Sequence, residues 1–360
     1  MYFKMENPFA VSAYYGPEYF CDRLDETQKL IQNMLNGNST TLISIRRMGK
    51  TGLLHHTLAQ LPSGWKGFYI DLLETENMNQ FLNLLTTAIL NSVSQESKLG
   101  KKFWNFIKSF RPIITFDGLT GAPQAIFDIR SHQVETNIDA IFEMLEKQNT
   151  KFLIAFDEFQ QILNYPEKNT DAWLRSRIQH LKNIVFIFSG SQQHIMSEIF
   201  TTPARPFYRS TLIMELGKIS TAEYSDFIIT MFKKRNKLID KNQVDEILEW
   251  TQSHTYYVQQ ICNKIFANTP TKTKVKDWKQ QAFQILKEQE IMFFTFRNML
   301  TTPQWNLFKA IAHEGKVVQP TAKSFLEKYK LGTSATVIRS LKTLINYELV
   351  YKLFDRDGNQ

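Results

Sequence analysis

The sequence lacks the features that mark secreted, membrane-spanning and disordered proteins. Its 360 residues include only two cysteines, Cys21 and Cys262, which form no C-x-x-C pair, so neither a disulfide framework nor a zinc site is expected. It has no apolar run of ~20 residues, and no basic N-terminal stretch that leads into an apolar one. A composition that is 43% hydrophobic and 22% charged excludes a disordered chain and suffices for two or three domains. We therefore expect a cytoplasmic protein with reduced thiols that does not enter a membrane.

A predicted strand at residues 40–45 leads through a basic loop into a predicted helix at residues 50–60. The loop follows the pattern G-x-x-x-x-G-K-[ST], in which backbone N–H groups at a helix N-terminus surround a phosphate. Its first glycine is replaced by Ser44, whose Cβ narrows the backbone choices of the turn. The residues expected to surround the phosphates are Ser44, Arg46, Arg47, Met48, Gly49, Lys50, Thr51 and Gly52.

Three of these loop residues have separate expected roles. Gly49 lets the backbone approach a phosphate closely. Lys50 is expected to reach the β- and γ-phosphates and to serve catalysis, and the Thr51 hydroxyl is expected to bind Mg²⁺. A Gly-Lys-Thr tripeptide also occurs in ordinary turns. The prediction of a phosphate-binding loop therefore depends on the strand and the helix on either side of it. The expected ligand is a nucleotide with its Mg²⁺.

A second apolar strand, residues 151–156, ends in the adjacent carboxylates Asp157 and Glu158. The run of apolar residues predicts a parallel strand that is buried on both faces. In P-loop enzymes Asp157 would hold Mg²⁺ and Glu158 would orient the attacking water. The alternative is an acidic pair that only caps the next helix, but two matched motifs in the right order favour the metal site.

A third apolar strand begins at residue 183 and ends in Ser189-Gly-Ser191. Ligands of open α/β sheets bind beyond the carboxyl ends of the strands. Ser189, Ser191 and Gln192 are therefore candidates to face the γ-phosphate. A Ser-Gly-Ser turn without a ligand is the alternative for each of them.

The other patterns of residues 1–217 complete an α/β domain. Further strands are expected at 66–72 and 211–216, and helices at 22–36, 78–95, 134–148 and 170–181. Two short apolar runs around a Gly/Pro turn predict a β-hairpin insert at about residues 96–133, which begins with a less regular Lys-rich stretch at 98–108. Because helices separate the strands, the sheet is expected to be mostly parallel.

Residues 218–292 contain helical patterns without buried strands, which suits a lid. The helices are expected at 220–235, 241–252, 254–268 and 275–291. Residues 293–360 form a third unit with helices near 303–313, 319–330 and 333–346, then a strand at 349–354 and a turn at Asp355-Arg-Asp-Gly. This order predicts a winged helix-turn-helix.

The last predicted helix has an apolar and a polar side. Its apolar residues at helical spacing are Val337, Ile338, Leu341, Leu344 and Ile345, which leaves Ser334, Arg339, Lys342 and Asn346 on the other side. Residues 291–360 carry ten Lys/Arg and five Asp/Glu, so they supply +5 of the net charge of +8. A basic winged helix can dock on DNA phosphates, with Arg339, Lys342 and Asn346 as its candidate nucleic-acid contacts. Contacts to protein are the alternative use.

Over nearly its whole length the chain resembles the archaeal-type P-loop ATPases, a branch of the AAA+/STAND nucleotide switches. The resemblance rests on Phe20-Cys-Asp-Arg23 with Glu26, Ile45-Arg-Arg-Met-Gly-Lys-Thr51, Phe156-Asp-Glu-Phe159, Ser189-Gly-Ser191, Arg205-Pro-Phe-Tyr208, His254-Thr-Tyr-Tyr-Val-Gln259 and the C-terminal winged helix. It implies a P-loop NTPase domain of the α/β class, followed by a helical lid and a winged helix.

The same resemblance implies that Asp22 and Arg23 lie near the adenine and that residues 254–259 close over the nucleotide. The chain departs from the family pattern at two positions. Ser44 replaces the first glycine of the loop, and Thr255 stands where relatives often have proline. These differences bear on the hydrolysis rate and the geometry of the lid more than on ATP binding.

Four arginines are candidates to reach a γ-phosphate, where a cation accelerates phosphoryl transfer. Arg46 and Arg47 lie within the loop. By resemblance, Arg205 and Arg209 are near the place where AAA+-like proteins carry a finger that acts on a neighbouring subunit. A surface position or a structural ion pair is the alternative for each, so a monomer and a nucleotide-dependent homo-oligomer both remain open.

Residues and resemblance together predict a Mg²⁺-dependent ATP-binding protein that hydrolyses ATP slowly and switches with its nucleotide state. The sequence does not name the protein partner that would receive this signal. A second hypothesis is a DNA-associated winged-helix regulator in which ATP is mainly structural. A third is a P-loop protein that has lost nucleotide binding through Ser44.

Overall fold

The computed structural model describes residues 6–93, 96–110, 112–118, 120–127 and 131–352 of the chain. It divides into two compact units, residues 1–275 (unit 1) and residues 276–360 (unit 2). The domain limits that the sequence suggests, after residues 217 and 292, stay a prediction. Among the described residues, no helix combines the length and the apolar character that crossing a membrane requires.

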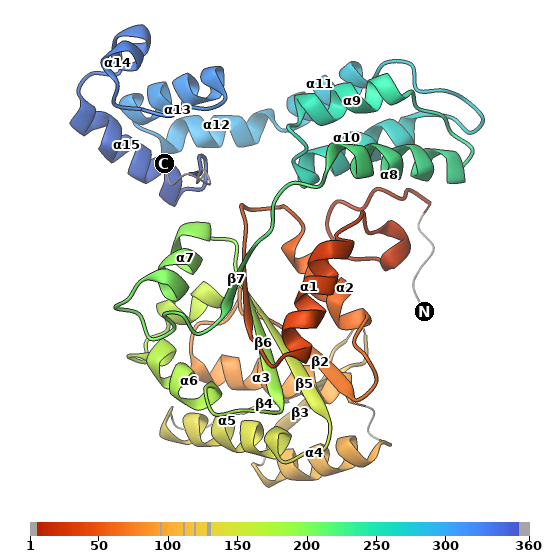
Figure 1. Cartoon of the computed structure of the whole chain (residues 1–360), viewed down its shortest axis with the longest axis vertical. Helices are drawn as coiled ribbons and strands as arrows, with labels where there is room; N and C mark the ends of the chain where they lie inside the picture. The colour runs from red at the N-terminus through yellow and green to blue at the C-terminus, as the bar shows by residue number, and fades with distance from the viewer. Residues whose placement is uncertain (1–5, 94–95, 111, 119, 128–130, 353–360) are drawn as a thin grey trace. The chain divides into compact units, whose positions relative to one another are not determined.

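Unit 1 is built around a parallel sheet whose strands, within the described residues, lie in the order β2-β5-β6-β1-β7. The strands are β1 (Thr40–Ile43), β2 (Trp65–Asp71), β5 (Lys151–Asp157), β6 (Ile184–Ser189) and β7 (Leu212–Glu215). Every neighbouring pair is parallel, so all carboxyl ends meet at one edge (Figure 1). The predicted mostly parallel sheet is confirmed.

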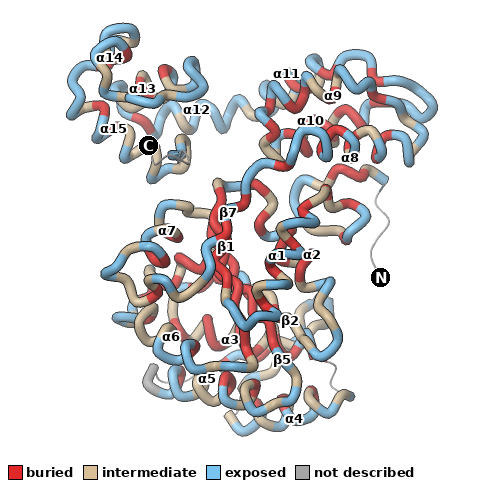
Figure 2. Tube along the Cα trace, in the orientation of Figure 1, coloured by how far each residue is buried: buried red, intermediate tan, exposed pale blue. Residues whose placement is uncertain are grey.

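Helices cover both faces of this sheet, and the strands supply apolar side chains to each. They are α1 (Leu24–Leu35), α2 (Lys50–Ala59), α3 (Met78–Ser92), α5 (Ser131–Glu146), α6 (Thr170–Ile178) and α7 (Gln193–Thr201), with 3₁₀ turns η1 (Pro17–Tyr19) and η2 (Phe159–Asn164). Strand β5 alternates: Leu153 and Ala155 pack with α1 and α2, while Phe152, Ile154 and Phe156 pack with α3, α5 and α6. Figure 2 shows the central strands as the most deeply buried part of unit 1.

The insert between α3 and α5 differs in part from the sequence prediction. Strands β3 (Ile113–Phe116) and β4 (Pro123–Ile126) pair antiparallel, so a hairpin is formed as predicted. The Lys-rich stretch before it is regular instead, because it forms helix α4 (Lys98–Ser109). The Ser97 hydroxyl accepts a hydrogen bond from Gly100 N at 2.9 Å and caps this helix. Phe103 and Ile107, four residues apart, bury its apolar side.

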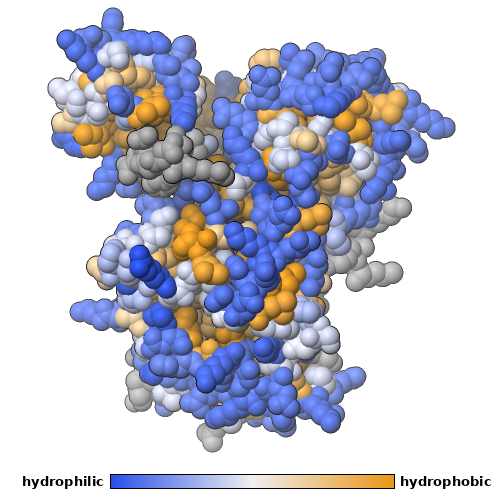
Figure 3. Space-filling model, in the orientation of Figure 1, coloured by the Kyte–Doolittle hydropathy of each residue, from blue (hydrophilic) through white to orange (hydrophobic). Residues whose placement is uncertain are grey.

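Unit 1 continues with helices α8 (Thr221–Lys234), α9 (Lys241–Trp250) and α10 (Thr255–Asn268), close to their predicted positions. Side-chain caps start the first two, with Ser220 before α8 and a capping box between Asp240 and Gln243 at α9. On the face drawn in Figure 3, hydrophilic side chains cover most of unit 1 and apolar surface lies in separate groups.

Unit 2 consists of helices α11 (Trp278–Glu288), α12 (Glu290–Met299), α13 (Thr302–Glu314), α14 (Lys323–Tyr329) and α15 (Ser334–Asn346). Three predictions for this region were wrong in part. The helix expected over 275–291 is interrupted at Gln289, which ends α11 and precedes the first residue of α12, Glu290. Ile338, placed by its spacing on the apolar side of α15, is 59% exposed, while Ser340 is buried. Residues 349–352 form no strand, and the expected turn at 355–358 lies outside the described residues.

Candidate active site

The loop between β1 and α2 curls around the side-chain ammonium of Lys50. Its Nζ donates to the Ser44 carbonyl (3.2 Å), to Ser44 Oγ (3.0 Å) and to the Ile45 carbonyl (3.2 Å). Gly49 has a φ of +93°, a backbone conformation that glycine adopts at no steric cost. Ser44 does not belong to the positive-φ residues, and its Oγ also donates to Ile45 O at 2.8 Å. A serine therefore fits at the first position of this loop without backbone strain.

Thr51, the residue after Lys50, links the loop to Asp157 at the end of β5. Thr51 Oγ1 donates to Asp157 Oδ2 at 2.6 Å, and the Tyr69 hydroxyl at the end of β2 donates to the same oxygen at 3.1 Å. Burial, and then the negative charge of Asp157, raise the pKa of Tyr69. The two residues predicted as metal ligands are thus brought together.

The donors at this edge suit Mg²⁺, which prefers oxygen ligands and few protein carboxylates. Thr51 supplies a hydroxyl and Asp157 a carboxylate, 2.6 Å apart. No cluster of three or more His, Cys, Asp or Glu side chains that could hold a metal occurs in the described part of the chain. A magnesium ion here would therefore complete its shell with water or phosphate oxygens in addition to these two side chains.

Glu158 is held by Ser191 and Gln160 from the adjoining strand end and turn. Its Oε2 accepts hydrogen bonds from Ser191 N (3.1 Å), Ser191 Oγ (2.8 Å) and Gln160 Nε2 (2.5 Å). Glu158 itself has a φ of +52°. Ser191, expected to face a phosphate, donates to this carboxylate, and its role toward a nucleotide stays a prediction. Gln160 was not singled out in the sequence, where its position two residues after the acidic strand end is the only signal.

Gly190 allows this close approach between the end of β6 and η2. A Cβ at this position would fall on Gln160 Oε1 and would lie 2.8 Å from Met196 Cγ. Ser189, the other serine predicted near the γ-phosphate, is fully buried. The Ser-Gly-Ser segment therefore packs closely against η2 and Glu158.

Arg23 ties the segment before α1 to the phosphate-binding loop and to the end of β7. Its buried guanidinium donates to Glu26 Oε1 (2.7 Å), to Met48 O (3.4 Å) and to Gly217 O (2.8 Å). The backbone of Arg23 has a φ of +72°, and that of Asp22 a φ of +46°. The turn that carries the two predicted adenine-side residues thus lies directly against the loop.

The start of α10 lies against the same loop. Thr255 Oγ1 donates to Met48 O at 3.4 Å, and the guanidinium carbon of Arg47 lies 4.2 Å from the ring centroid of Tyr256. His254 is half-buried just before the helix, and burial lowers its pKa. The segment predicted to close over a nucleotide is therefore in contact with the loop through two of its side chains.

The other arginine candidates have partners inside the chain. Arg205 forms an ion pair with Glu198, and the guanidinium carbon of Arg209 lies 5.3 Å from the ring centroid of Tyr208. Arg46 is exposed in the loop. These contacts fit structural roles, and a finger role for Arg205 or Arg209 stays a prediction.

The candidate nucleic-acid residues lie on helix α15 in unit 2. Arg339, Lys342 and Asn346 are all exposed, while Val337 and Leu344 are buried. Arg339 Nε donates to the Ala335 carbonyl at 3.4 Å, within the helix. The predicted separation of polar and apolar sides holds for these five residues.

Comparisons with known proteins agree with this geometry. A family model for an ATPase domain predominantly from Archaea matches residues 20–261, and a model for a probable winged helix domain matches residues 291–356. No curated protein matches the chain. The Walker-type ATPase PABY2304 of Pyrococcus abyssi has a similar solved structure, with 18% identity, a TM-score of 0.67 and coverage of 97% of this chain and 95% of that one.

Two ORC proteins of Aeropyrum pernix have related structures. ORC2, solved as ADPNP–ADP complexes, has 13% identity and a TM-score of 0.58, with coverage of 97% of this chain and 91% of that chain. ORC1, solved in complex with DNA, has 13% identity and a TM-score of 0.50, with coverage of 95% and 88%. At such identities the likeness shows a shared P-loop NTPase fold. Because the ATPase model matches well over half of the sequence, the chain belongs to the family of ATPase domains found predominantly in Archaea, and it carries a winged helix domain after it.

Proposed function

We propose that the protein binds ATP with Mg²⁺, hydrolyses it slowly, and changes its contacts with a protein partner according to nucleotide state. The observation that carries the proposal is the meeting of Thr51 and Asp157, 2.6 Å apart, at the edge where the Lys50 loop also ends. A hydroxyl, a carboxylate and an ammonium at one edge of the sheet are the groups with which P-loop ATPases bind a nucleotide and its metal ion.

Each side chain has a role in this proposal. Lys50 would exchange its three loop oxygens for phosphate oxygens as a point charge. Thr51 and Asp157 would hold Mg²⁺, which neutralises charge on the phosphates. Glu158 would orient and polarise the attacking water. Ser191 and Gln160 fix the Glu158 carboxylate through one oxygen.

The slow rate and the switch behaviour are supported by contacts around the loop. Glu158 is held by three hydrogen bonds to one oxygen, so using it in catalysis requires these donors to stay in place or to rearrange. Met48 O accepts from both Arg23 and Thr255, so a change in the loop acts directly on the N-terminal segment and on α10. A ligand that binds with different affinity to two positions of α10 shifts the equilibrium between those positions. The size of the shift is set by that difference in affinity.

Calorimetric titration with Mg²⁺-ATP and Mg²⁺-ADP, with phosphate release followed in parallel, tests the proposal. The wild type should bind both nucleotides, and Lys50→Ala should lose at least about tenfold in affinity because a charge-assisted contact disappears. Glu158→Gln should bind normally and release little phosphate. A wild type that binds neither nucleotide contradicts the proposal.

A second candidate is a DNA-associated regulator in which ATP serves structure. The exposed Arg339, Lys342 and Asn346 on α15 favour it, because guanidinium, ammonium and amide groups are the side chains that contact phosphates and base edges. The ORC1 structure, solved with DNA, adds support from a protein of the same fold. If this second candidate is correct, the protein needs bound nucleotide to fold. Its binding to a DNA duplex is then independent of ATP hydrolysis.

A further inference from the structure

A cavity lies at the opposite edge of the sheet from the candidate nucleotide site. It has a volume of about 300 Å³ and is bordered by the amino ends of β1, β6 and β7 and by the end of α6. Its lining residues include Ser39 just before β1, Ile184 at the start of β6 and Leu212 at the start of β7. Since Lys50 comes after the carboxyl end of β1 and Asp157 is the last residue of β5, this cavity is separate from the site described above.

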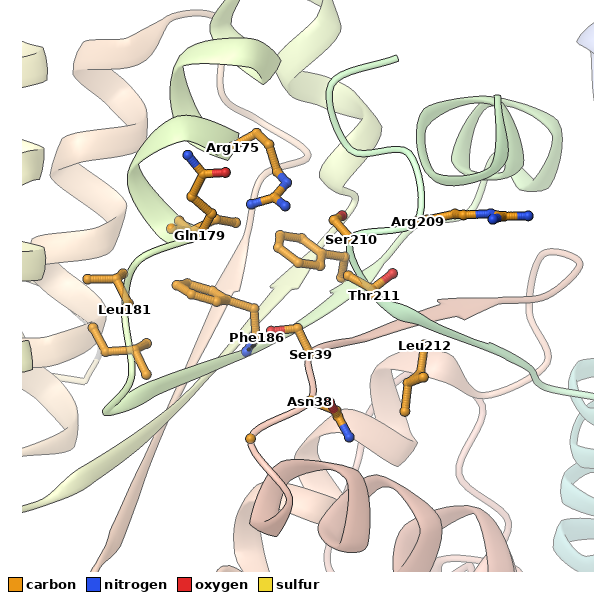
Figure 4. A pocket seen from close by; sticks show the side chains of 14 residues that line it. Asn38, Ser39, Arg175, Gln179, Leu181, Phe186, Arg209, Ser210, Thr211 and Leu212 are labelled. Carbon is orange, nitrogen blue, oxygen red and sulfur yellow. Dashed lines mark hydrogen bonds between the residues drawn. The ribbon is translucent and has the colours of Figure 1, made fainter. Parts of the chain in front are cut away.

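One arginine, Arg175, points into this cavity. Figure 4 shows its guanidinium directed from α6 toward the side of the cavity on which Ser210 lies, whereas the guanidinium of Arg209 extends away from the centre. The lining contains no Asp or Glu among its described residues. Arg175 makes no ion pair and no side-chain hydrogen bond within the described part of the chain. Its positive charge is therefore not balanced by the walls of the cavity.

Two other arginines in this part of unit 1 have acidic partners. Arg177, two residues along α6, pairs with Asp139 at 3.1 Å, and Arg205 pairs with Glu198. A planar guanidinium offers several N–H donors in a fixed fork that matches a carboxylate or a phosphate. Arg175 differs from these neighbours in having that fork directed at a cavity instead of at a carboxylate.

Further hydrogen-bonding groups surround the same space. Ser39 Oγ accepts from Phe186 N at 3.1 Å, which leaves its own proton to donate to a ligand. Phe186 and Phe188 also line the cavity, but with 2% and 1% of their surface exposed they offer a ligand almost no apolar area. A volume of about 300 Å³ is at the lower end of small-molecule sites.

From these observations we infer that the cavity binds a small organic anion, with its carboxylate or phosphate on Arg175 and Ser39. The inference does not depend on ATP hydrolysis. The ligand would connect α6 to the strands whose other ends carry the phosphate-binding loop and Ser191. Binding here is therefore placed to stabilise the same sheet that supports the nucleotide site.

Calorimetry on the full chain with benzoate and with phenyl phosphate tests this inference and separates the two anion types. Benzamide, which has the ring without the charge, is the neutral control probe. One-to-one binding of at least one anion in the millimolar range or tighter is expected, with no binding of benzamide. Arg175→Gln should weaken this binding at least tenfold, because it removes the charge and the fork.

A matched variant on the same helix is the control. Arg177→Gln also removes one positive charge from α6, but from a side chain that already pairs with Asp139, so binding of the anion should change less than twofold. Lys50→Ala should leave it unchanged as well, since Lys50 lies at the other edge. Circular dichroism shows whether each variant is folded, and Gln179→Phe, which narrows the cavity from α6, offers a second way to block it.

Three outcomes would overturn the inference. They are the absence of binding of either anion at millimolar concentration, equal binding of benzamide, and anion binding that survives both Arg175→Gln and Gln179→Phe. Loss of anion binding in Lys50→Ala would likewise count against it, because the anion would then occupy the phosphate-binding loop.

Discussion

At the scale of single residues, the surroundings of Glu158 show how one carboxylate can be fixed without a cation. Three donors meet on its Oε2, two of them from Ser191 and one from Gln160. Hydrogen bonds to a charged group are stronger than those between neutral groups, so each of these donors limits the rotation of the carboxylate. Gln160 is itself almost fully buried, and the absence of a side chain at Gly190 provides its space.

We expect Gln160→Leu to slow ATP hydrolysis by about tenfold with little change in ATP affinity, because one hydrogen bond to the charged carboxylate is lost. If Gln160 acts through Glu158, the same substitution should have no further effect on the residual rate of Glu158→Gln. The measurement is a double-mutant cycle on the rate of phosphate release. Gln161→Leu is the control, since its amide donates to Thr75 O instead. Additive effects in the cycle would show that Gln160 acts elsewhere.

At the scale of elements, helix α10 connects the phosphate-binding loop to the rest of the helical segment. Thr255 and Tyr256 contact the loop residues Met48 and Arg47, and the fully buried Tyr224 of α8 donates to Thr255 O at 3.3 Å. A rearrangement of the loop therefore reaches α8 through one turn of α10. His254, which precedes that turn, has a pKa lowered by burial.

The lowered pKa of His254 predicts how stability depends on pH. The unfolded chain takes up a proton at the usual histidine pKa while the folded protein still excludes it, so the free energy of unfolding falls as pH is lowered through that value. The loss is complete below the folded pKa. His55 and His56, whose pKa values burial also lowers, act in the same direction.

His254→Gln should therefore reduce the difference in unfolding free energy between pH 7.5 and pH 5.5, measured by chemical denaturation. His180→Gln, at an exposed histidine, offers a matched control substitution. An unchanged slope in His254→Gln would mean that this ring is hydrated in the folded protein.

The helices and strands differ in how well their positions could be predicted from the sequence. Buried strands such as β5 and β6 are continuous apolar runs, so these elements were predicted close to their true bounds. Helix α4 was missed because lysines hide its apolar spacing, which only burial of Phe103 and Ile107 against unit 1 resolves. The hydrogen bond of Arg23 to Gly217 and the close approach of Gln160 to Gly190 join residues far apart in the sequence, and no local pattern reports them.

At the scale of the whole molecule, the excess positive charge of residues 291–360 makes DNA binding testable on the full chain. If α15 contacts the duplex, log K should fall linearly with log salt concentration, and Arg339→Gln with Lys342→Gln should lower the slope by about 2, one unit for each lost phosphate contact. The control pair is Lys323→Gln with Lys328→Gln, whose side chains pair with Glu327 and Glu314. Duplex affinity that does not respond to salt, or equal slopes for both double variants, would direct the search to protein partners.

The strand order has a consequence for the synthesis of the chain. Strand β1, which carries the phosphate-binding loop, pairs with β6 and β7, and contacts such as Ser39 to Phe186 and Thr41 to Thr211 span 147 and 170 residues. At roughly 5–20 residues per second, a ribosome takes about 7–30 s to deliver that length. During this interval both edges of β1 lack their native neighbours, so the loop cannot acquire its final form before the third strand motif and β7 have emerged. The nucleotide site is thus among the last parts of unit 1's sheet to become complete, although its motif is among the first to be translated.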